Sequence, residues 1–234
     1  MENLWNTVFY EPLYNALIFL TGIVPDIGIA VVVLTVLVKI ILYPFQTKSI
    51  KSQIELKQIQ PEIDKIKEKF PNKEDQARET FALYKERKIN PFSGCLLVLV
   101  QIPIIIALYQ VFIRGLLDHD GVLYSFVSFP ESVSTMFLGL VDISQKSIIF
   151  AVLAGVTQFF QARMSLSRNT VDANDKSFKG EFMRSMNVQV KYILPVFVGV
   201  IAYQVSGAVA LYWTTSNLFG IFHEWRIRKN SSRK

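Results

Sequence analysis

A lysine lies inside an apolar segment, where its charge could attract an oppositely charged group. In TVLVKIILYP, residues 35 to 44, Lys39 is the one charged residue. A charge at the centre of a bilayer costs about 2.5–3.5 kcal/mol on insertion scales. Two interpretations stay open. The four-carbon stem could carry the ammonium roughly 6 Å to the headgroups at the end of the helix, or the ammonium could face a hydrated cavity inside the protein.

Other polar side chains occur within the apolar segments, and together they favour the second interpretation. They are Gln101, Gln158, Gln161, Tyr203 and Gln204, followed by a cluster formed by Trp213, Thr214, Thr215, Ser216 and Asn217. Each of them alone is explained by a hydrogen bond between helices, which is the common case. As a set that includes Lys39, they predict a polar surface in the interior of a helical bundle.

The sequence does not indicate bond-breaking chemistry. It contains no recognisable nucleotide-binding loop, metal-ligand cluster or nucleophile–base pair. His119 and His223 are isolated, and Cys95 follows Gly94 at the expected start of a helix, so each is predicted to be structural. We therefore expect a protein that is not an enzyme and that needs no cofactor or metal.

The elements that must position these residues are predicted to be transmembrane helices. The chain has 234 residues, of which 51% are hydrophobic, and its mean hydropathy is +0.31. Apolar runs of about 18 residues or more indicate membrane spans. Five such segments lie near residues 22–43, 92–113, 146–163, 188–205 and 208–225. They predict an all-α membrane protein with one core domain, residues 1–225, and a short basic tail, residues 226–234.

Basic residues are concentrated in three segments, and their positions predict the topology. Of the 25 Lys and Arg residues, 22 lie in residues 46–90, in residues 163–191 or from Arg226 onward. Residues 1–26 and 115–145 contain none. With five spans, the three basic segments lie on one side of the membrane, which the positive-inside rule makes cytoplasmic. The N-terminus is then predicted outside and the C-terminus inside.

The first residues predict an amphipathic helix, at about residues 3–18, that lies at the membrane surface. An apolar stripe with a spacing of four residues consists of Trp5, Phe9, Leu13 and Leu17. Such a stripe is one face of a helix, and a helix of this kind can lie in the plane of the interface. The alternative is the first part of a span that is interrupted at Pro25.

The charged segment 46–90 predicts an antiparallel helical hairpin in the cytoplasm. Its first helix carries an apolar stripe formed by Ile59, Ile63, Ile66 and Phe70. Pro61 should kink or divide this helix, and Asn72 can cap a second helix that ends near Arg87. The segment is either a solvated connector or a docking arm for a partner. Its 11 basic and 8 acidic residues are closely mixed, which argues against a strong nucleic-acid site.

Five motifs, in this order and with these gaps, resemble the YidC-type membrane protein insertases and their mitochondrial and chloroplast relatives. The motifs are LVKIILYPF (37–45), LKQIQPEIDKIKEKF (56–70), NPFSGC (90–95), QIPIIIALY (101–109) and SGAVALYWTTSNLF (206–219). The resemblance implies a five-span core around a hydrophilic groove that is open to the cytoplasm and to lipid. It also implies that the protein assists membrane proteins into the bilayer of the bacterial cytoplasmic membrane, alone or beside the Sec translocon.

The resemblance also implies a set of groove residues. Bacterial members usually carry an arginine in the first span, and Lys39 occupies the matching position. Lysine keeps the charge but lacks the forked donor geometry of a guanidinium group. Gln101 and Trp213 match positions that line the groove in relatives. Thr35, one turn before Lys39, completes the predicted substrate-contacting set together with Thr214 and Asn217.

The partners that the resemblance implies are nascent membrane proteins, above all small proteins with acidic tails, and the lipid bilayer. Residues 46–90 and the basic tail are candidates for contact with the Sec translocon, the signal recognition machinery and the ribosome. A rival hypothesis is a small transporter or channel in which Lys39 is a solute site. A membrane enzyme or an accessory subunit of one would need a clustered site, which the sequence does not show.

Overall fold

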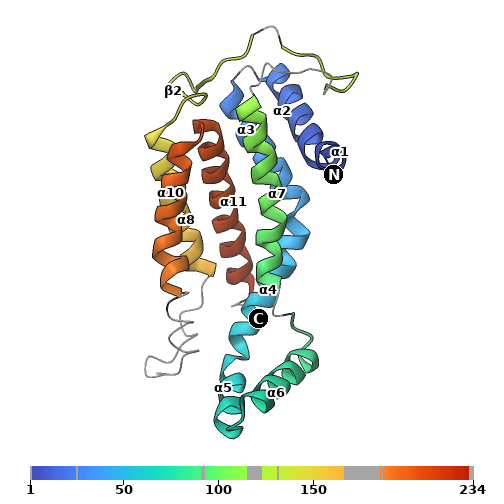
Figure 1. Ribbon diagram of the computed structural model, residues 1–234, viewed down its shortest axis with the longest axis vertical. Coiled ribbons are helices and arrows are strands. Elements are labelled where there is room, and N and C mark those ends of the chain that lie inside the picture. Colours follow the sequence, from blue (N-terminus) through green and yellow to red (C-terminus); the bar gives the residue numbers. More distant parts are fainter. Residues whose placement is uncertain are drawn as a thin grey trace.

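The computed structural model describes residues 2–24, 26–90, 93–114, 123–130, 132–165, 185 and 187–231, together with most of their side chains. The described part is an elongated bundle of helices with a helical hairpin at one end (Figure 1). His119 and the last residues of the basic tail, 232–234, lie outside the described residues. The side chain of Cys95 also lies outside them.

Helices occupy all five segments that were predicted as spans. They are α3 (Ile27–Ile41), α7 (Ser93–Arg114), α8 (Ile148–Ser165), α10 (Leu194–Gln204, preceded by the π-helical η2, Gln189–Ile193) and α11 (Gly207–Ser231). The predicted all-α class is thus confirmed. By length and apolar composition, one helix of the described part, α8, is able to cross a membrane alone, and α3 with the following helix qualifies as a bent pair. The number of spans stays a prediction.

Small residues allow α8 and α10 to pack closely. A Cβ atom added at Gly155 of α8 would lie 3.1 Å from the carbonyl oxygen of Pro195, and Gly199 of α10 lies opposite Gly155. Gly199 faces the backbone carbonyl of Ala151 of α8, a residue that is also buried. Glycine and alanine at such positions are typical of helix pairs whose backbones approach within a membrane.

The N-terminal segment is helical through α1 (Glu2–Trp5), η1 (Asn6–Tyr10) and α2 (Glu11–Ile23). Its buried side chains are Tyr10, Tyr14, Asn15, Leu17, Ile18 and Thr21. Of the apolar stripe predicted from the sequence, only Leu17 is fully buried. Trp5, Phe9 and Leu13 are partly exposed, as an apolar stripe that faces a membrane surface would be. The position of this segment at a membrane surface stays a prediction.

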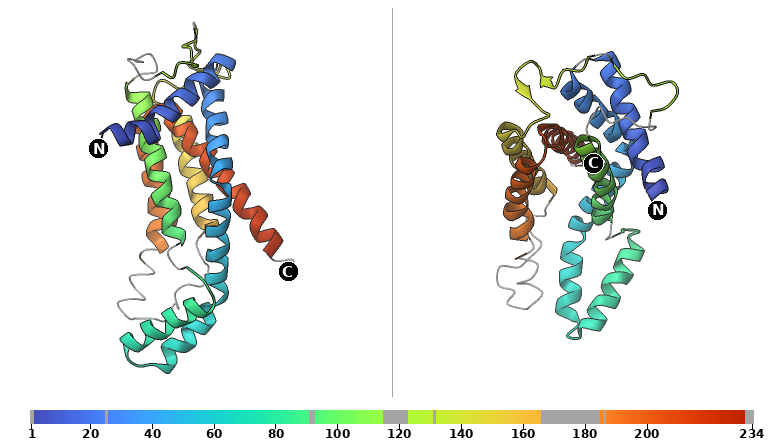
Figure 2. Two further views of the ribbon diagram at one scale, coloured as in Figure 1. Left: turned by 90° about the vertical axis from the view of Figure 1, so that its right-hand side faces the viewer. Right: turned by 45° about the horizontal axis from the view of Figure 1, so that its top comes forward.

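The hairpin predicted for residues 46–90 is present. Helix α4 (Tyr43–Gln58) continues from α3 after a bend of 63°, and α5 (Gln60–Lys69) and α6 (Lys73–Glu86) lie side by side at its end (Figures 1 and 2). Pro61 lies in the first turn of α5, at the predicted joint. The Asn72 side chain accepts a hydrogen bond from the Glu74 N–H, so the predicted cap of α6 is confirmed.

A small apolar core holds the hairpin together. It contains the buried side chains of Ile59, Ile63, Leu83 and Ile89, with Ile66 packed against them. Two hydrogen bonds of 2.8 and 2.9 Å from Arg87 to the carboxylate of Glu62 join the two arms at the surface. The interior stripe of the first arm therefore follows the spacing expected from the sequence, and Phe70 lies just after its end.

The opposite end of the bundle carries a two-stranded sheet that the sequence analysis did not predict. Strands β1 (Met136–Phe137) and β2 (Val141–Asp142) pair through a tight turn at Gly139, whose φ is +70°. The Asp26 carboxylate caps α3 by accepting from the N–H groups of Gly28 and Ile29, and it also accepts from the Leu138 N–H. One side chain thus joins this sheet to the first residues of α3.

Candidate polar site within the helical bundle

Lys39 lies on α3, one turn before the bend into α4, and its side chain points into the protein. Only 6% of the residue is exposed. Its Nζ atom donates a hydrogen bond of 3.0 Å to Oε1 of Gln101 on α7. The Gln101 amide nitrogen donates in turn to the hydroxyl group of Tyr212 on α11. Three helices that are distant in the sequence therefore meet at one chain of polar side chains.

The positive charge of Lys39 has no carboxylate partner in the described part of the chain. The ion pairs found there include Lys67–Asp64, Arg78–Asp75, Arg78–Glu79, Arg87–Glu62 and Arg228–Glu224, and Lys39 belongs to none of these pairs. Buried charges are normally paired, because removal from water is expensive. A neutral amide oxygen compensates for this cost only in part. An ionisable residue that is buried without a counter-ion among helices of this kind is a candidate functional group.

The other predicted groove residues are placed differently. The buried hydroxyl groups of Thr35 and Thr214 donate to backbone carbonyls one turn earlier in their own helices, at 2.6 and 2.9 Å. The Asn217 amide donates to Thr157 of α8 at 3.2 Å, so it joins α11 to α8. Trp213 is partly buried against the main core. The structure thus links Lys39 directly to Gln101, and it shows no side-chain hydrogen bond from these four to Lys39.

Sequence reasoning missed Tyr212, which lies beside Trp213 in the ALYWTTSN motif. Its ring is 2% exposed and belongs to the main apolar core. An aromatic residue inside an apolar run is expected to be core, so its hydroxyl group was not assigned to the polar interior. The distinguishing signal was its position next to the polar cluster that begins at Trp213.

His223 lies where α11 meets α4. Its ring stacks on Tyr43 with a centroid distance of 4.0 Å, and its Nε2 atom lies 2.9 Å from the Thr47 hydroxyl oxygen. It is 1% exposed. These contacts are consistent with the structural role expected from the sequence, and they hold the first turns of α4 against α11.

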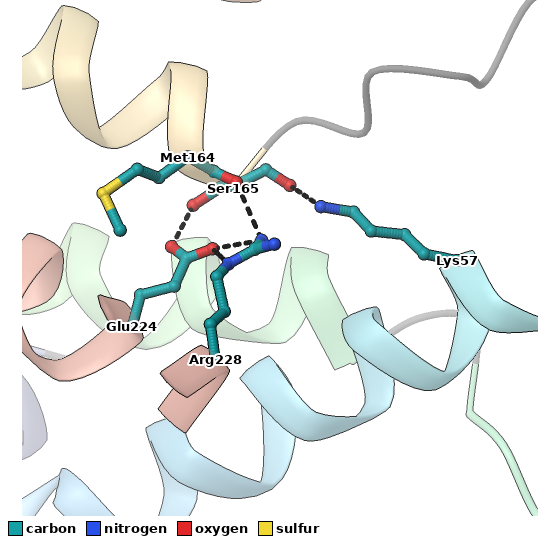
Figure 3. A network of polar contacts seen from close by, with 5 residues as sticks. All are labelled: Lys57, Met164, Ser165, Glu224 and Arg228. Carbon is teal, nitrogen blue, oxygen red and sulfur yellow. Dashed lines mark hydrogen bonds and ion pairs between the residues drawn. The ribbon is translucent and has the colours of Figure 1, made fainter. Parts of the chain in front are cut away.

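A second polar cluster, also missed from the sequence, joins α4 to the ends of α8 and α11 (Figure 3). The buried carboxylate of Glu224 accepts hydrogen bonds from Arg228 and from the Ser165 hydroxyl group. Arg228 also donates to the carbonyl of Met164, and Lys57 of α4 donates to the carbonyl of Ser165. Two cations therefore bind the last carbonyl groups of α8, where the helix dipole is negative.

This second cluster lowers the pKa of Lys57, which lies outside the apolar part of the bundle. Burial lowers the pKa of Lys57, and the nearby charge of Arg228 lowers it further, while Glu224 opposes the change. The cluster joins the stem of the hairpin to the ends of α8 and α11. No group of three or more His, Cys, Asp or Glu side chains able to hold a metal occurs among the residues that the structure describes.

Comparison with known proteins identifies the family. The model of the family described as 60Kd inner membrane protein matches residues 19–234, which is nearly the whole chain. The chain belongs to this family. Its relatives carry the name membrane protein insertase YidC. The resemblance inferred from the five sequence motifs is thereby confirmed.

Two relatives match over most of their length. The membrane protein insertase YidC of Fusobacterium nucleatum subsp. nucleatum is 32% identical over 213 residues, which cover 89% of each protein. That of Oceanobacillus iheyensis is 29% identical over 235 residues, which cover 97% of this chain and 85% of the relative. The YidC of Actinobacillus pleuropneumoniae serotype 3 is also 29% identical, and the chain covers 38% of its length.

A solved structure supports the fold. The crystal structure described as an active YidC insertase with its first transmembrane domain resolved superposes with a TM-score of 0.57 at 23% sequence identity. The match covers 93% of this chain and 45% of that protein. The arrangement of helices in this family member is therefore shared with a known insertase.

Proposed function

We propose that this chain acts as a membrane protein insertase of the bacterial cytoplasmic membrane, in which the five bundle helices span the bilayer. Family membership and the names of the relatives support the class of function. The hairpin, the end of α8 and the end of α11 lie at the same end of the bundle (Figure 1). Because the hairpin and the end of α11 are rich in Lys and Arg, we place this end in the cytoplasm, with the N-terminus outside.

The single observation that carries the mechanism is the buried, unpaired charge of Lys39. The energy of two opposite charges scales inversely with the effective dielectric constant, so an acidic residue is attracted far more strongly at this site than in water. An acidic tail of a substrate supplies the carboxylate that Lys39 lacks. The charge is thereby neutralised, and the tail is drawn part of the way across about 30 Å of hydrocarbon.

The later steps of the proposed insertion require no chemical reaction. A hydrophilic groove around Lys39, lined further by Gln101, Trp213, Thr35, Thr214 and Asn217, shortens the dry distance that a polar tail must cross. The apolar segment that follows the tail then moves sideways into lipid. Burial of its apolar surface drives this step, at about 25 cal/mol for each Å² removed from water. No nucleotide, metal or covalent intermediate is part of this proposal.

Partners beyond the substrate follow from the charged surfaces. The hairpin of residues 46–90 is the proposed first receiver of nascent chains and a contact for targeting machinery. Arg226 and Lys229, exposed near the end of α11, are placed to contact anionic lipid or ribosomal RNA. The protein could also act beside the Sec translocon, because the proposed mechanism releases the substrate sideways into lipid.

The test is insertion of a small single-span protein with an acidic N-terminal tail into liposomes that contain the purified protein. We expect wild type and Lys39→Arg to insert the substrate, and Lys39→Ala and Lys39→Glu to fail. A matched substrate with the tail carboxylates changed to amides should depend much less on Lys39. Equal insertion by all four proteins would remove Lys39 from the mechanism. No insertion, together with solute flux through the same liposomes, would favour a transporter.

A further inference from the structure

Chemistry fixes the direction of the hydrogen bonds around Lys39. A lysine ammonium can only donate, so the Gln101 group that faces it must be the carbonyl oxygen. The Gln101 amide nitrogen then points away from Lys39 and donates to the Tyr212 hydroxyl oxygen. The orientation of the Gln101 amide group is therefore set from both sides, by the donor at Lys39 and by the acceptor at Tyr212.

Tyr212 is suited to be that fixed acceptor. Its side chain is 2% exposed and packs in the main core of the bundle. A phenol ring held in this way carries its oxygen at one place, whereas a glutamine side chain rotates about three bonds. Without the hydroxyl group, the Gln101 nitrogen would be left unsatisfied in a partly buried site, so the side chain would turn toward another acceptor and its oxygen would no longer be held at Lys39.

We propose that Tyr212 is a positioning residue, which holds the Gln101 carbonyl toward Lys39 and so keeps the ammonium in place to receive a substrate carboxylate. The effect on substrate binding rests on the proposed insertase function, whereas the hydrogen bonds among Tyr212, Gln101 and Lys39 do not depend on it. A carboxylate that arrives replaces the Gln101 oxygen at Lys39. Gln101 stays hydrogen-bonded to Tyr212 during this exchange. When the substrate leaves, the Gln101 oxygen again accepts a hydrogen bond from the Lys39 ammonium.

The first experiment measures the position of Lys39 without any insertion assay. The purified protein is treated with a small water-soluble acylating reagent, and the rate of modification of Lys39 is followed by mass spectrometry. Tyr212→Phe should raise that rate about two- to tenfold, the range that one hydrogen bond is worth. Tyr14→Phe, which removes a phenol oxygen from the same core on α2, is the matched control and should not change it. An unchanged rate in Tyr212→Phe overturns the proposal.

The second experiment is a double-mutant cycle in the liposome assay. If Tyr212 acts through Gln101, then Tyr212→Phe should reduce insertion of the acidic-tail substrate but add nothing in a Gln101→Leu background. The amide-tail substrate should be unaffected. Independent, additive losses would show that Tyr212 only stabilises the fold. Loss of insertion in every protein, with the acylation result intact, would contradict the proposed function and leave the positioning role standing.

Discussion

Glu224 and Arg228 face each other one turn apart at the end of α11, with Arg228 Nε 2.9 Å from Glu224 Oε1. The Glu224 side chain is 5% exposed and that of Arg228 is 33% exposed. The acid is thus enclosed, while its partner reaches the surface and also binds a carbonyl of α8. This pair, together with Ser165, fixes the last turn of α8 to α11.

Glu224→Gln is expected to destabilise the protein by about 1–3 kcal/mol, because it removes a charged acceptor of two donors from a buried position. The free energy of unfolding in detergent micelles is the measurement. Asp64→Asn is the matched control, because Asp64 pairs with Lys67 at the surface, where such a pair contributes at most about 1 kcal/mol. Equal losses in the two variants would mean that Glu224 is exposed in solution.

Ile63→Ala should destabilise the hairpin more than Arg87→Ala does. Ile63 is 6% exposed in the core between α5 and α6, and truncation of such a residue costs about 2–5 kcal/mol. The Arg87–Glu62 pair has side chains that are 48% and 41% exposed, so we expect a loss below about 1 kcal/mol. The rate of amide hydrogen exchange over residues 60–86 measures the stability of the hairpin in each of the two variants. A larger effect of Arg87→Ala would show that the surface pair, and not the apolar core, holds the arms together.

Two substitutions at Asp26 should separate its two roles. Asp26→Ala removes the cap of α3 as well as the acceptor for the Leu138 N–H, and we expect a loss of about 1–2 kcal/mol. Asp26→Asn keeps one oxygen for the cap and places an amide nitrogen, which cannot accept, toward Leu138. Hydrogen exchange should therefore rise at Leu138 in both variants, and at the Gly28 N–H only in Asp26→Ala. Unchanged exchange at Leu138 in both would contradict the contact.

Stability should rise with pH in a window that Lys57 sets. Burial and the charge of Arg228 lower the pKa of Lys57 below its ordinary value of 10.5. Between the folded pKa and 10.5 the unfolded chain binds more protons, so the free energy of unfolding increases as the pH rises through this window. Wild type should therefore gain stability relative to Lys57→Gln as the pH is raised from neutral toward this value. A constant difference would show that Lys57 is solvated.

Local features were predictable from the sequence because neighbouring residues determine them. Asn72 caps α6 and Pro61 starts α5 through interactions within one turn of helix. The two strands around Gly139 were not predictable, because each has two residues and shows no alternating pattern. Their position depends on Asp26, which is more than a hundred residues away.

The polar site was predictable in part. Lys39 and Gln101 were named because a charge and an amide are conspicuous in apolar helices. That they bond to each other depends on how α3 and α7 are placed by α2 and α11, the two helices that pack against both of them. Tyr212 and Glu224 were missed for a related reason, since a tyrosine in an apolar run and a glutamate near a basic tail become distinctive only when other helices pack on them.

The bend between α3 and α4 has a mechanical consequence. Leu42 separates the two helices, Lys39 lies just before it, and α4 runs without a break for 16 residues to the hairpin. A slack loop would absorb a displacement of the hairpin, but a continuous helix transmits it. The contacts of α4 with α7 and α11 anchor this helix in the bundle. The hairpin is therefore held in a fixed direction relative to Leu42, which lies within one helical turn of the buried ammonium.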